Sequence, residues 1–415
     1  MARNRVFYQS ESVFAGPDGA TGVHVDKVQG SLNLVEQTSN ISRLQRIQSA
    51  NYSFTIDRTD LNQFGELAAV DRIILTSPTV SMDFSYVLAN MSNEHILGFN
   101  VSDDGGTSAI KNFLDKSKDE RNYFIKTSKE GLDNIGDTYG APDYSSNVNG
   151  VMAAGIGVIG VGNGFLTSYT AEGAVGDFPT ASVSIEGLNM TFDSNISGNI
   201  IPAINPVDGS KMDGYNNYGA VEYVLPTGRM GGTGHQHNST DLTSALRPGD
   251  VTFTLYKAGG GHIPPGALLE GLPAIGLIED ANLQSFSCSF DLTRTPIEKL
   301  GSRFAFSREI DFPITVTFTV DAIMGDLTTG NLADVIDADQ NYDICVHLKG
   351  SDVNDIGDGN GKVEKARYQV KRAKLDSTEF TSDIGSNKSV SLTFSSQVGG
   401  PNQTDVGLFM SGVYS

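Results

Sequence analysis

One run of glycines has the spacing of a nucleotide-binding turn. Residues 155–160 read Gly-Ile-Gly-Val-Ile-Gly and fit G-x-G-x-x-G, in which the backbone approaches a pyrophosphate at the start of a helix. That site needs a helix after the glycines, yet the next residues, Val161-Gly162-Asn163-Gly164, would not start a stable one. We interpret residues 151–165 as a buried or loop-like β segment, too short and glycine-rich to cross a membrane, and predict no bound cofactor.

Two further segments carry possible metal ligands. Residues 352–364 read DVNDIGDGNGKVE and resemble a calcium loop, but Ile356 falls at the fifth ligand position and the EF-hand spacing is not recovered. We interpret this segment as a solvated turn between two strands, with calcium as the open alternative. His235 and His237, with His262 further on, lie in a Gly-rich stretch without a nearby Asp, Glu or Cys ligand, which favours a surface loop. We predict no metal site.

The residues of hydrolytic enzymes are not arranged in a recognisable pattern. There is no G-x-S-x-G elbow and no Cys/His pair with catalytic spacing. The two cysteines, Cys288 and Cys345, are too few for a disulfide framework, and Cys288 is predicted to be a small buried apolar residue. Carboxylates are abundant, but the sequence gives no reason to select one pair as acid and base. We predict that the chain is not an enzyme.

Composition limits the kinds of partner. The chain has 415 residues, 39% hydrophobic residues, 47 glycines, no tryptophan and a net charge of −20. Many short strands with polar outer faces fit this mixture. A protein that grips nucleic acid needs clustered cations to displace the counterions of the phosphates, and this chain has no such cluster. It would repel DNA, and we expect neither a secretory signal nor a membrane partner.

An internal repeat organises the chain. Residues 48–84 align without gaps with residues 284–320, and the identical residues include Gln48/Gln284, Ser49/Ser285, Ser53/Ser289, Phe54/Phe290, Arg58/Arg294, Thr59/Thr295, Gly65/Gly301, Ala69/Ala305, Thr79/Thr315 and Val80/Val316. Apolar and polar residues alternate at the start of each copy, which predicts a half-buried strand. A second alternating strand follows in each copy, around Met82 and Phe318.

Helical spacing follows the two strands of each copy. Thr107 could cap a turn that carries Ile110, Phe113 and Leu114, and Thr329 could cap one that carries Leu332, Val335 and Ile336. The sequence then predicts a strand at Asn122 in line with one at Asn341, and a final strand pair that includes 182–185 in one copy and 363–375 with 389–394 in the other. The order strand, strand, helix, strand, strand thus occurs twice.

These elements give a mainly β fold with two tandem repeats. We predict an N-terminal arm at 1–45, a first repeat at 46–187 with an Asp/Gly/Ser/Asn-rich insertion near 128–150, a linker or insertion subdomain at 188–272, and a second repeat at 273–415.

Four segments resemble the major tail tube proteins of tailed bacteriophages. They are RVFYQSE at 5–11, RIQSANYSF at 46–54, ALRPGD at 245–250 and FAFSREIDFP at 304–313. The resemblance implies a β sandwich or half-barrel with one short flanking helix per repeat, and a structural protein of the virion tail assembled in the host cytoplasm. It also implies partners: copies of the chain in stacked rings, the tape measure and terminator proteins, a possible sheath, and DNA in passage only.

Tube rings of this family usually hold six domains. A chain with two copies would satisfy that number with three subunits, as a homotrimer with pseudo-sixfold symmetry. The alternative is a hexamer that uses one copy in the wall and the other as decoration. Contacts between rings are expected from the arm at 1–45 and from loops such as 351–361.

The polar residues of the second repeated strand are short hydroxyls and acids. If they line the lumen, DNA meets a smooth and negative wall. The candidate lumen-facing residues are Thr79, Ser81, Asp83, Ser85, Thr315, Thr317, Thr319 and Asp321. The alternative is that they face solvent or an outer layer.

Two other functions stay open at this point. One is a different virion protein, such as a baseplate hub, a tail terminator or a decoration protein. The other is an extracellular carbohydrate-binding β protein, although tryptophan, the commonest sugar platform, is absent.

Overall fold

The structure is a computed structural model, and part of the chain is described. The described residues are 11–17, 23–24, 26–28, 31–33, 42–75, 77–102, 106–127, 157–194, 202–210, 223–224, 246, 251–257, 261–262, 282–301, 304–323, 339–351, 362–381, 389–403 and 405–414. The predicted helix at 329–336, the insertion at 128–150, His235, His237 and the possible calcium ligands 352–361 lie outside these residues.

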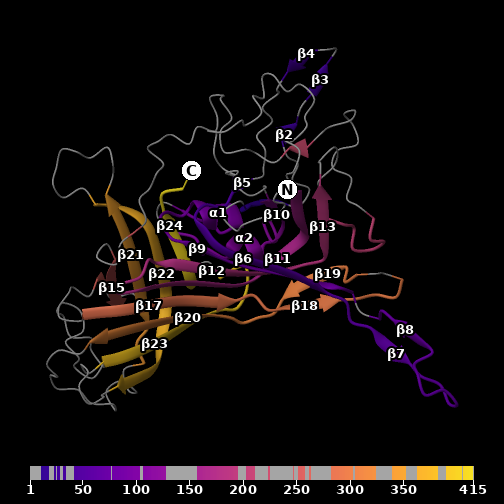
Figure 1. Cartoon of the computed structure of the whole chain (residues 1–415). Helices are drawn as coiled ribbons and strands as arrows, with labels where there is room; N and C mark the ends of the chain where they lie inside the picture. The colour runs from indigo at the N-terminus through magenta and orange to yellow at the C-terminus, as the bar shows by residue number, and fades with distance from the viewer. Residues whose placement is uncertain are drawn as a thin grey trace.

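The fold is mainly β, as predicted, and most strands belong to one connected sixteen-stranded sheet (Figure 1). The described residues include two short helices, α1 (Ser92–Leu97) and α2 (Lys111–Leu114). Small two-stranded sheets stand outside the large one: β2 (Val23–His24) with β14 (Tyr223–Val224), β3 (Asp26–Val28) with β4 (Ser31–Asn33), β7 (Thr59–Leu61) with β8 (Asp71–Ile73), and β18 (Arg294–Ile297) with β19 (Ser307–Ile310).

The N-terminal half of the chain, up to residue 210, contributes one run of antiparallel neighbours. In sheet order these are β5 (Ser42–Arg43), β1 (Glu11–Pro17), β10 (Glu120–Thr127), β11 (Gly157–Ala174), β12 (Thr180–Gly187), β9 (Thr79–Val87) and β6 (Ile47–Thr55). A further strand, β13 (Asn189–Ser194), pairs with the first part of β11.

The C-terminal half, from residue 251 onward, contributes a second run with the same connections. In sheet order these are β16 (Gly261–His262), β15 (Val251–Lys257), β21 (Tyr342–Ser351), β22 (Lys362–Thr381), β23 (Ser389–Val398), β20 (Ile314–Ile323) and β17 (Asn282–Asp291). The last strand, β24 (Gly407–Gly412), pairs with the first part of β22 as β13 does with β11.

The ladders of the two halves also agree in register. Three register shifts fall at matching steps: Ile47/Ser49 and Leu283/Ser285, Arg121/Tyr123 and Tyr342/Ile344, and Leu166/Ser168 and Leu375/Ser377. A β-bulge re-aims a strand and sets its twist, so bulges at the same steps bend both runs in the same way. The two halves therefore correspond strand by strand.

The halves meet along one antiparallel ladder between β11 and β17. Ser168 lies opposite Asp291, and Ala174 lies opposite Ser285 at the other end of the ladder. The second part of β11 thus has β12 on one side and β17 on the other, which makes the sheet continuous from one half to the other.

Period-two alternation explains why these segments are strands with one buried side. In β9, Val80, Met82 and Phe84 are buried, whereas the residues between them are partly or fully exposed. The same pattern holds in β20, where Val316 and Phe318 are buried. Successive side chains of a strand point to opposite faces, so one face of the sheet packs in the core and the other is polar.

The helices differ from the expectation. Thr107 does not cap a helix; α2 begins four residues later, and its N-cap is Ile110 without a side-chain cap hydrogen bond. Ile110, Phe113 and Leu114 are buried as their spacing predicted. The apolar spacing of the sequence does not predict α1, because the buried residues of this helix include Ser92, Asn93 and Glu94.

The boundaries of the repeats also differ. Glu11–Pro17, assigned to an N-terminal arm, forms β1 inside the sheet, because Val13, Phe14 and Ala15 pack in the core. The region 188–272, assigned as a linker, supplies β13 to the N-terminal half and β15 to the C-terminal half. The ladders align β10 with β21 two residues away from the pairing of Asn122 with Asn341.

Candidate functional site

All eight residues predicted to line a lumen lie on the side of the sheet opposite the core. Thr79, Ser81, Asp83 and Ser85 are partly or fully exposed on β9. Thr315, Thr317, Thr319 and Asp321 are placed in the same way on β20. The structure puts each set of four on one face, but several strands lie between the two sets.

Neighbouring strands extend this face with more hydroxyls. The side chains of Ser49 and Ser85 are hydrogen-bonded across β6 and β9 at 2.7 Å, and those of Ser53 and Ser81 at 2.8 Å. In the C-terminal half, the Ser285 hydroxyl donates to Oδ2 of Asp321 at 2.5 Å. These bonds hold short side chains flat against the sheet, because each satisfies its neighbour.

The second parts of β11 and β22 complete the surface. Ser168 and Thr170 of β11 lie opposite Ser184 and Ser182 of β12 and opposite Asp291 and Ser289 of β17. The eight strands then follow one another without a break in the order β6, β9, β12, β11, β17, β20, β23 and β22. We call the non-core side of this run the polar face.

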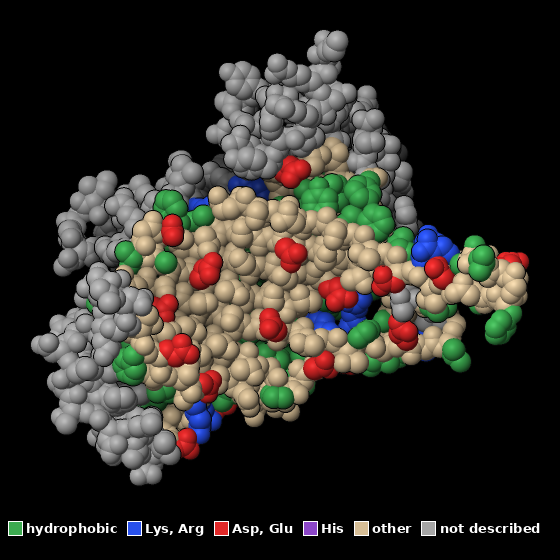
Figure 2. Space-filling view, turned by 60° about the horizontal axis from the view of Figure 1, so that its bottom comes forward, with side chains coloured by type: hydrophobic (Ala, Val, Ile, Leu, Met, Phe, Trp, Pro, Cys, Tyr) green, Lys and Arg blue, Asp and Glu red, His purple; other side chains and the backbone are tan. Residues whose placement is uncertain are grey.

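The polar face carries several acids, and the one Lys or Arg at its described strand positions is Lys374, which lies opposite Ser395 on β22 and pairs with Asp339 at 2.7 Å. Residues that share it with the eight predicted ones include Ser49, Asn51, Ser53, Ser168, Thr170, Glu172, Ser182, Ser184, Glu186, Ser285, Ser287, Ser289, Asp291, Ser377, Glu379, Ser391, Thr393 and Ser395. Figure 2 shows a broad surface of backbone and uncharged side chains with scattered carboxylates. Arg308 approaches it only at the end of β12, where it pairs with Glu186 at 2.6 Å.

Alternation in the sequence predicts the eight residues on β9 and β20 but not the other residues of the polar face. The same alternation predicts strands at 182–185, at 389–394 and at the start of each repeat. It does not assign their polar positions to a common face, because only the ladders reveal which strands are neighbours.

The described residues show no metal cluster, no reactive thiol and no dinucleotide-binding turn. Among them, no group of three His, Cys, Asp or Glu side chains could hold a metal ion. Burial raises the pKa of Cys288 and of Cys345 to about 12, so neither is a reactive thiolate near neutral pH. Gly157 and Gly160 lie within β11, which continues as a strand to Ala174, so no helix follows the glycines as a dinucleotide site requires.

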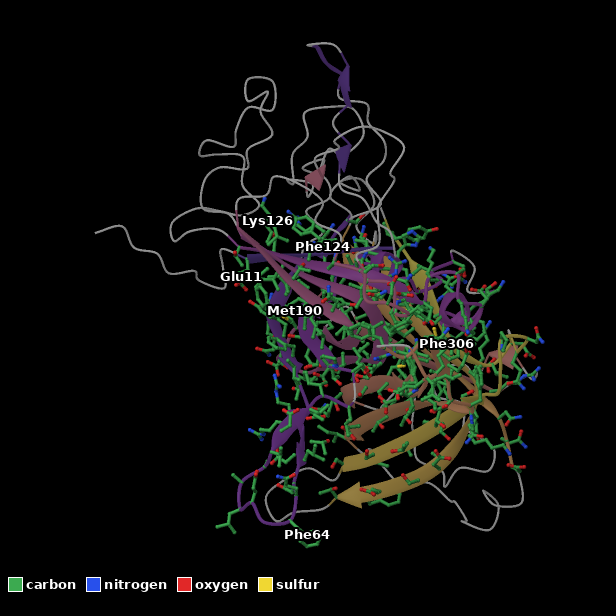
Figure 3. The ribbon with its side chains drawn as sticks, turned by 90° about the vertical axis from the view of Figure 1, so that its right-hand side faces the viewer. Glu11, Phe64, Phe124, Lys126, Met190 and Phe306 are labelled. Atoms are coloured by element: carbon green, nitrogen blue, oxygen red, sulfur yellow. The ribbon has the colours of Figure 1, made fainter. Side chains whose placement is uncertain are left out.

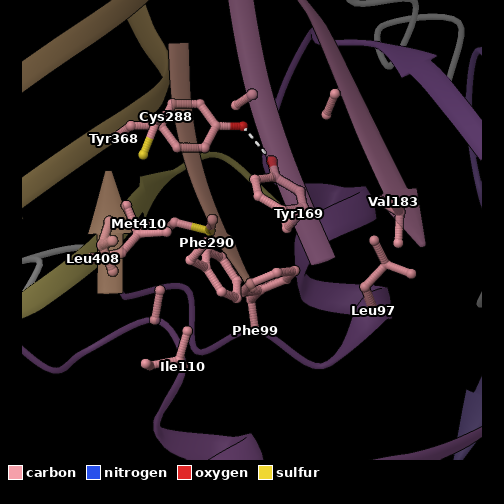
Figure 4. Packing of buried hydrophobic residues seen from close by; sticks show 14 of the residues in the cluster. Leu97, Phe99, Ile110, Tyr169, Val183, Cys288, Phe290, Tyr368, Leu408 and Met410 are labelled. Atoms are coloured by element: carbon pink, nitrogen blue, oxygen red, sulfur yellow. Dashed lines mark hydrogen bonds between the residues drawn. The ribbon is translucent and has the colours of Figure 1, made fainter. Parts of the chain in front are cut away.

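One buried ionisable cluster joins the halves. Glu94 of α1 accepts hydrogen bonds from the hydroxyls of Tyr86 at 2.7 Å, Tyr169 at 2.9 Å and Tyr368 at 3.3 Å. The Tyr169 and Tyr368 hydroxyls are 2.8 Å apart, and Figure 4 shows this bond where the two halves pack together. Burial raises the pKa of Glu94, while the tyrosine hydroxyls oppose that shift. The cluster is enclosed, so we assign it a structural role.

His347 on β21 is hydrogen-bonded through both ring nitrogens to residues of neighbouring strands. Nδ1 of His347 lies 2.6 Å from Glu364 across β21 and β22, and Nε2 lies 3.2 Å from the Thr254 hydroxyl.

None of the helices in the described part of the chain is long and apolar enough to cross a membrane.

Comparison with known proteins gives only distant likenesses. No family model matches the sequence, and no curated protein matches it. The tail of an empty gene transfer agent particle with C6 symmetry is 15% identical, with a TM-score of 0.24, over 37% of this chain and 98% of that one. The native gene transfer agent virion is 12% identical, with a TM-score of 0.21, over 37% of this chain and 89% of that one. A crystal structure of an Hcp protein is 9% identical, with a TM-score of 0.20, over 39% of this chain and 98% of that one. TM-scores this far below 0.5 decide neither the fold of the whole chain nor its function.

Proposed function

We propose that this chain is a structural subunit of a phage-type tail tube, in which stacked rings enclose a channel for DNA. The observation that carries the proposal is the polar face: a continuous surface of eight strands, covered by short hydroxyls and carboxylates, with Lys374 on β22 as the one Lys or Arg at its described strand positions. An enzyme has no use for so extended and uniform a surface, whereas a channel wall requires one.

The proposed mechanism is physical. Phosphates bind proteins mainly through Lys and Arg, which release counterions from the nucleic acid. A wall of hydroxyls with acids such as Asp83, Glu172, Asp321 and Glu379 gives almost no such contacts, since Lys374 is paired with Asp339, and the wall repels the DNA weakly. Thr79, Ser81, Asp83, Ser85 and their counterparts Thr315, Thr317, Thr319 and Asp321 then face the lumen, and the duplex slides without adhering.

We further propose that each chain carries two copies of the tube domain. Support comes from the matching order of the strands, from the three register shifts at equivalent steps, and from positive φ at the equivalent hairpin residues Gly65 and Gly301. Gly is favoured there because a side chain would strain a left-handed turn. The first copy includes β1 and β13, and the second includes β15, so both extend beyond 46–187 and 273–415.

Two domains per chain allow a ring of six domains from three subunits. Sheets that close on themselves remove exposed strand edges, and a closed ring of copies is the symmetric way to achieve this. Such rings would stack in the host cytoplasm and become part of the virion, together with tape-measure, terminator and possible sheath proteins.

Negative-stain electron microscopy of the purified protein, with rotational averaging, tests the proposal. Six-lobed rings or long hollow tubes, with a mass per ring of three chains by mass photometry, are the expected result. Single rings that never stack would favour a terminator or hub protein instead. Monomers under all salt and concentration conditions would overturn the tube assignment.

A further inference from the structure

The junction between the two halves is formed by three contacts. The edge strand β17 of the C-terminal half pairs with the second part of β11. The hairpin β18–β19, which follows β17, packs beside the N-terminal half. Three residues of the N-terminal half bond to β24 and the residue after it: the backbone N–H of Ala109 donates to the Leu408 carbonyl at 2.7 Å, that of Ser102 to Met410 at 3.2 Å, and that of Met91 to Val413 at 2.9 Å.

Each of the two strands that pair at this junction has an equivalent strand in the other half. Neither equivalent strand is paired in this way within the chain. The strand equivalent to β17 is β6, whose ladder partner among the described residues is β9 alone. The strand equivalent to β11 is β22. From Ser377 to Glu379 it pairs with β23 on one edge, and no described strand pairs with its other edge. The run of eight strands that forms the polar face therefore has two complementary edges, β6 at one end and the second part of β22 at the other.

Burial differs between equivalent residues as an absent neighbour would require. Phe290 of β17 is 2% exposed, but Phe54 at the same position of β6 is 54% exposed. Met410 of β24 is 0% exposed, but Phe192 at the same position of β13 is 63% exposed. The residues are equally apolar, so only the environment differs, and what is missing around β6 and β13 is the second half of a junction.

The two hairpins differ in the same way. Hairpin β18–β19 is fixed to the N-terminal half by a buried ion pair, in which Arg294 contacts Asp119 at 2.5 and 2.9 Å, and by Lys116 with Glu309 at 2.7 Å. Hairpin β7–β8 projects from the body, and Figure 3 shows Phe64 at its far end. Its apolar residues are exposed, with Leu61 at 52% and Ile73 at 42%.

We propose that the edge strand β6 and hairpin β7–β8 of one subunit dock on the second part of β22 of the next subunit, and so repeat between chains the junction that β17 and β18–β19 form within one chain. The partner is a second copy of this chain, and the inference rests on the proposed function. The β11–β17 ladder fixes the register. Tyr169 opposite Phe290 becomes Thr378 opposite Phe54, and Thr170 opposite Ser289 becomes Glu379 opposite Ser53.

Cysteine cross-linking of the assembled full-length protein tests this register. The variant Ser53→Cys with Glu379→Cys is expected to form disulfides only between chains, which gives covalent dimers and trimers on a non-reducing gel. Either substitution alone should give neither product, and an equimolar mixture of the two single variants should give dimers only. The native Cys288 and Cys345 are buried and do not interfere.

Two control variants test whether disulfide formation reports the predicted strand register. Thr170→Cys with Ser289→Cys reproduces the same pairing within one chain and should form an intrachain disulfide even in monomers. Ser53→Cys with Thr381→Cys keeps the same face but shifts the register by two residues, and should cross-link at least fivefold less.

The outcomes separate the inference from the proposed function. Rings or tubes without a cross-link between positions 53 and 379, or with a stronger one between positions 53 and 381, would overturn the docking of β6 on β22 and leave the tube assignment intact. Absence of any ring from the unsubstituted protein would overturn both. Rings together with the predicted cross-link would support both.

Discussion

The equivalent residues Phe54 and Phe290 allow one substitution to be compared in two environments. Phe290 is 2% exposed, and its ring lies 5.9 Å from Tyr169 and 6.0 Å from Phe99, measured between centroids. Phe290→Ala removes a fully packed ring and should lower the free energy of unfolding by about 3–5 kcal/mol. Phe54 is 54% exposed, so Phe54→Ala loses only about half of the usual transfer free energy, roughly 1 kcal/mol.

Urea unfolding of the monomeric protein measures this difference. With a slope of about 3 kcal/mol/M, Phe290→Ala should lower the midpoint by about 1–1.7 M and Phe54→Ala by about 0.3 M. The chain has no tryptophan, so far-UV circular dichroism and tyrosine fluorescence serve as the two probes, and their coincidence tests two-state behaviour.

The exposed part of Phe54 should appear in assembly instead. If a neighbour buries that part, each junction loses about 1–2 kcal/mol in Phe54→Ala, so the concentration required for ring formation rises about 5- to 30-fold. Sedimentation velocity across a dilution series measures this concentration. Equal destabilisation of the monomer by the two substitutions would refute the burial argument, and unchanged assembly of Phe54→Ala would refute the docking of β6.

Three further predictions concern other parts of the molecule. Arg294→Met leaves the Asp119 carboxylate buried without its partner and should cost about 3–5 kcal/mol of stability by urea unfolding; a loss under about 1 kcal/mol would show that the pair does not hold the halves together. Because burial raises the pKa of Glu94, the unfolded state loses the carboxyl proton at a lower pH than the folded state does, so stability should fall as pH rises from the usual carboxyl pKa to the raised one. Glu94→Gln should flatten this pH dependence in thermal melts between pH about 4 and 8. An unchanged pH dependence would contradict the assignment to Glu94. Asp83→Lys with Asp321→Lys should slow DNA delivery by assembled particles and make it salt-dependent, with each lysine–phosphate contact adding about one to the salt slope, whereas unchanged delivery would mean that these residues do not face the channel.

Much of the fold was readable in the sequence because β-strands carry their own period. The alternation around Met82 and Phe318 gave β9 and β20 with the correct buried side, and the alignment of 48–84 with 284–320 matched the ladders residue for residue. Local spacing suffices there, since one face of a strand must be apolar wherever it covers a core. The absence of a helix after Gly160 was likewise a local property of the residues that follow.

Only the tertiary structure decided which strands are neighbours. Glu11–Pro17 resembles an arm in sequence, and its place beside β10 depends on a partner more than one hundred residues away. The polar face depends on the β11–β17 ladder, which joins the two halves of the chain and leaves no trace in the sequence of either half alone. The same holds for Phe54 and Phe290: the sequence makes them identical, and the packing of one half against the other buries only one of them.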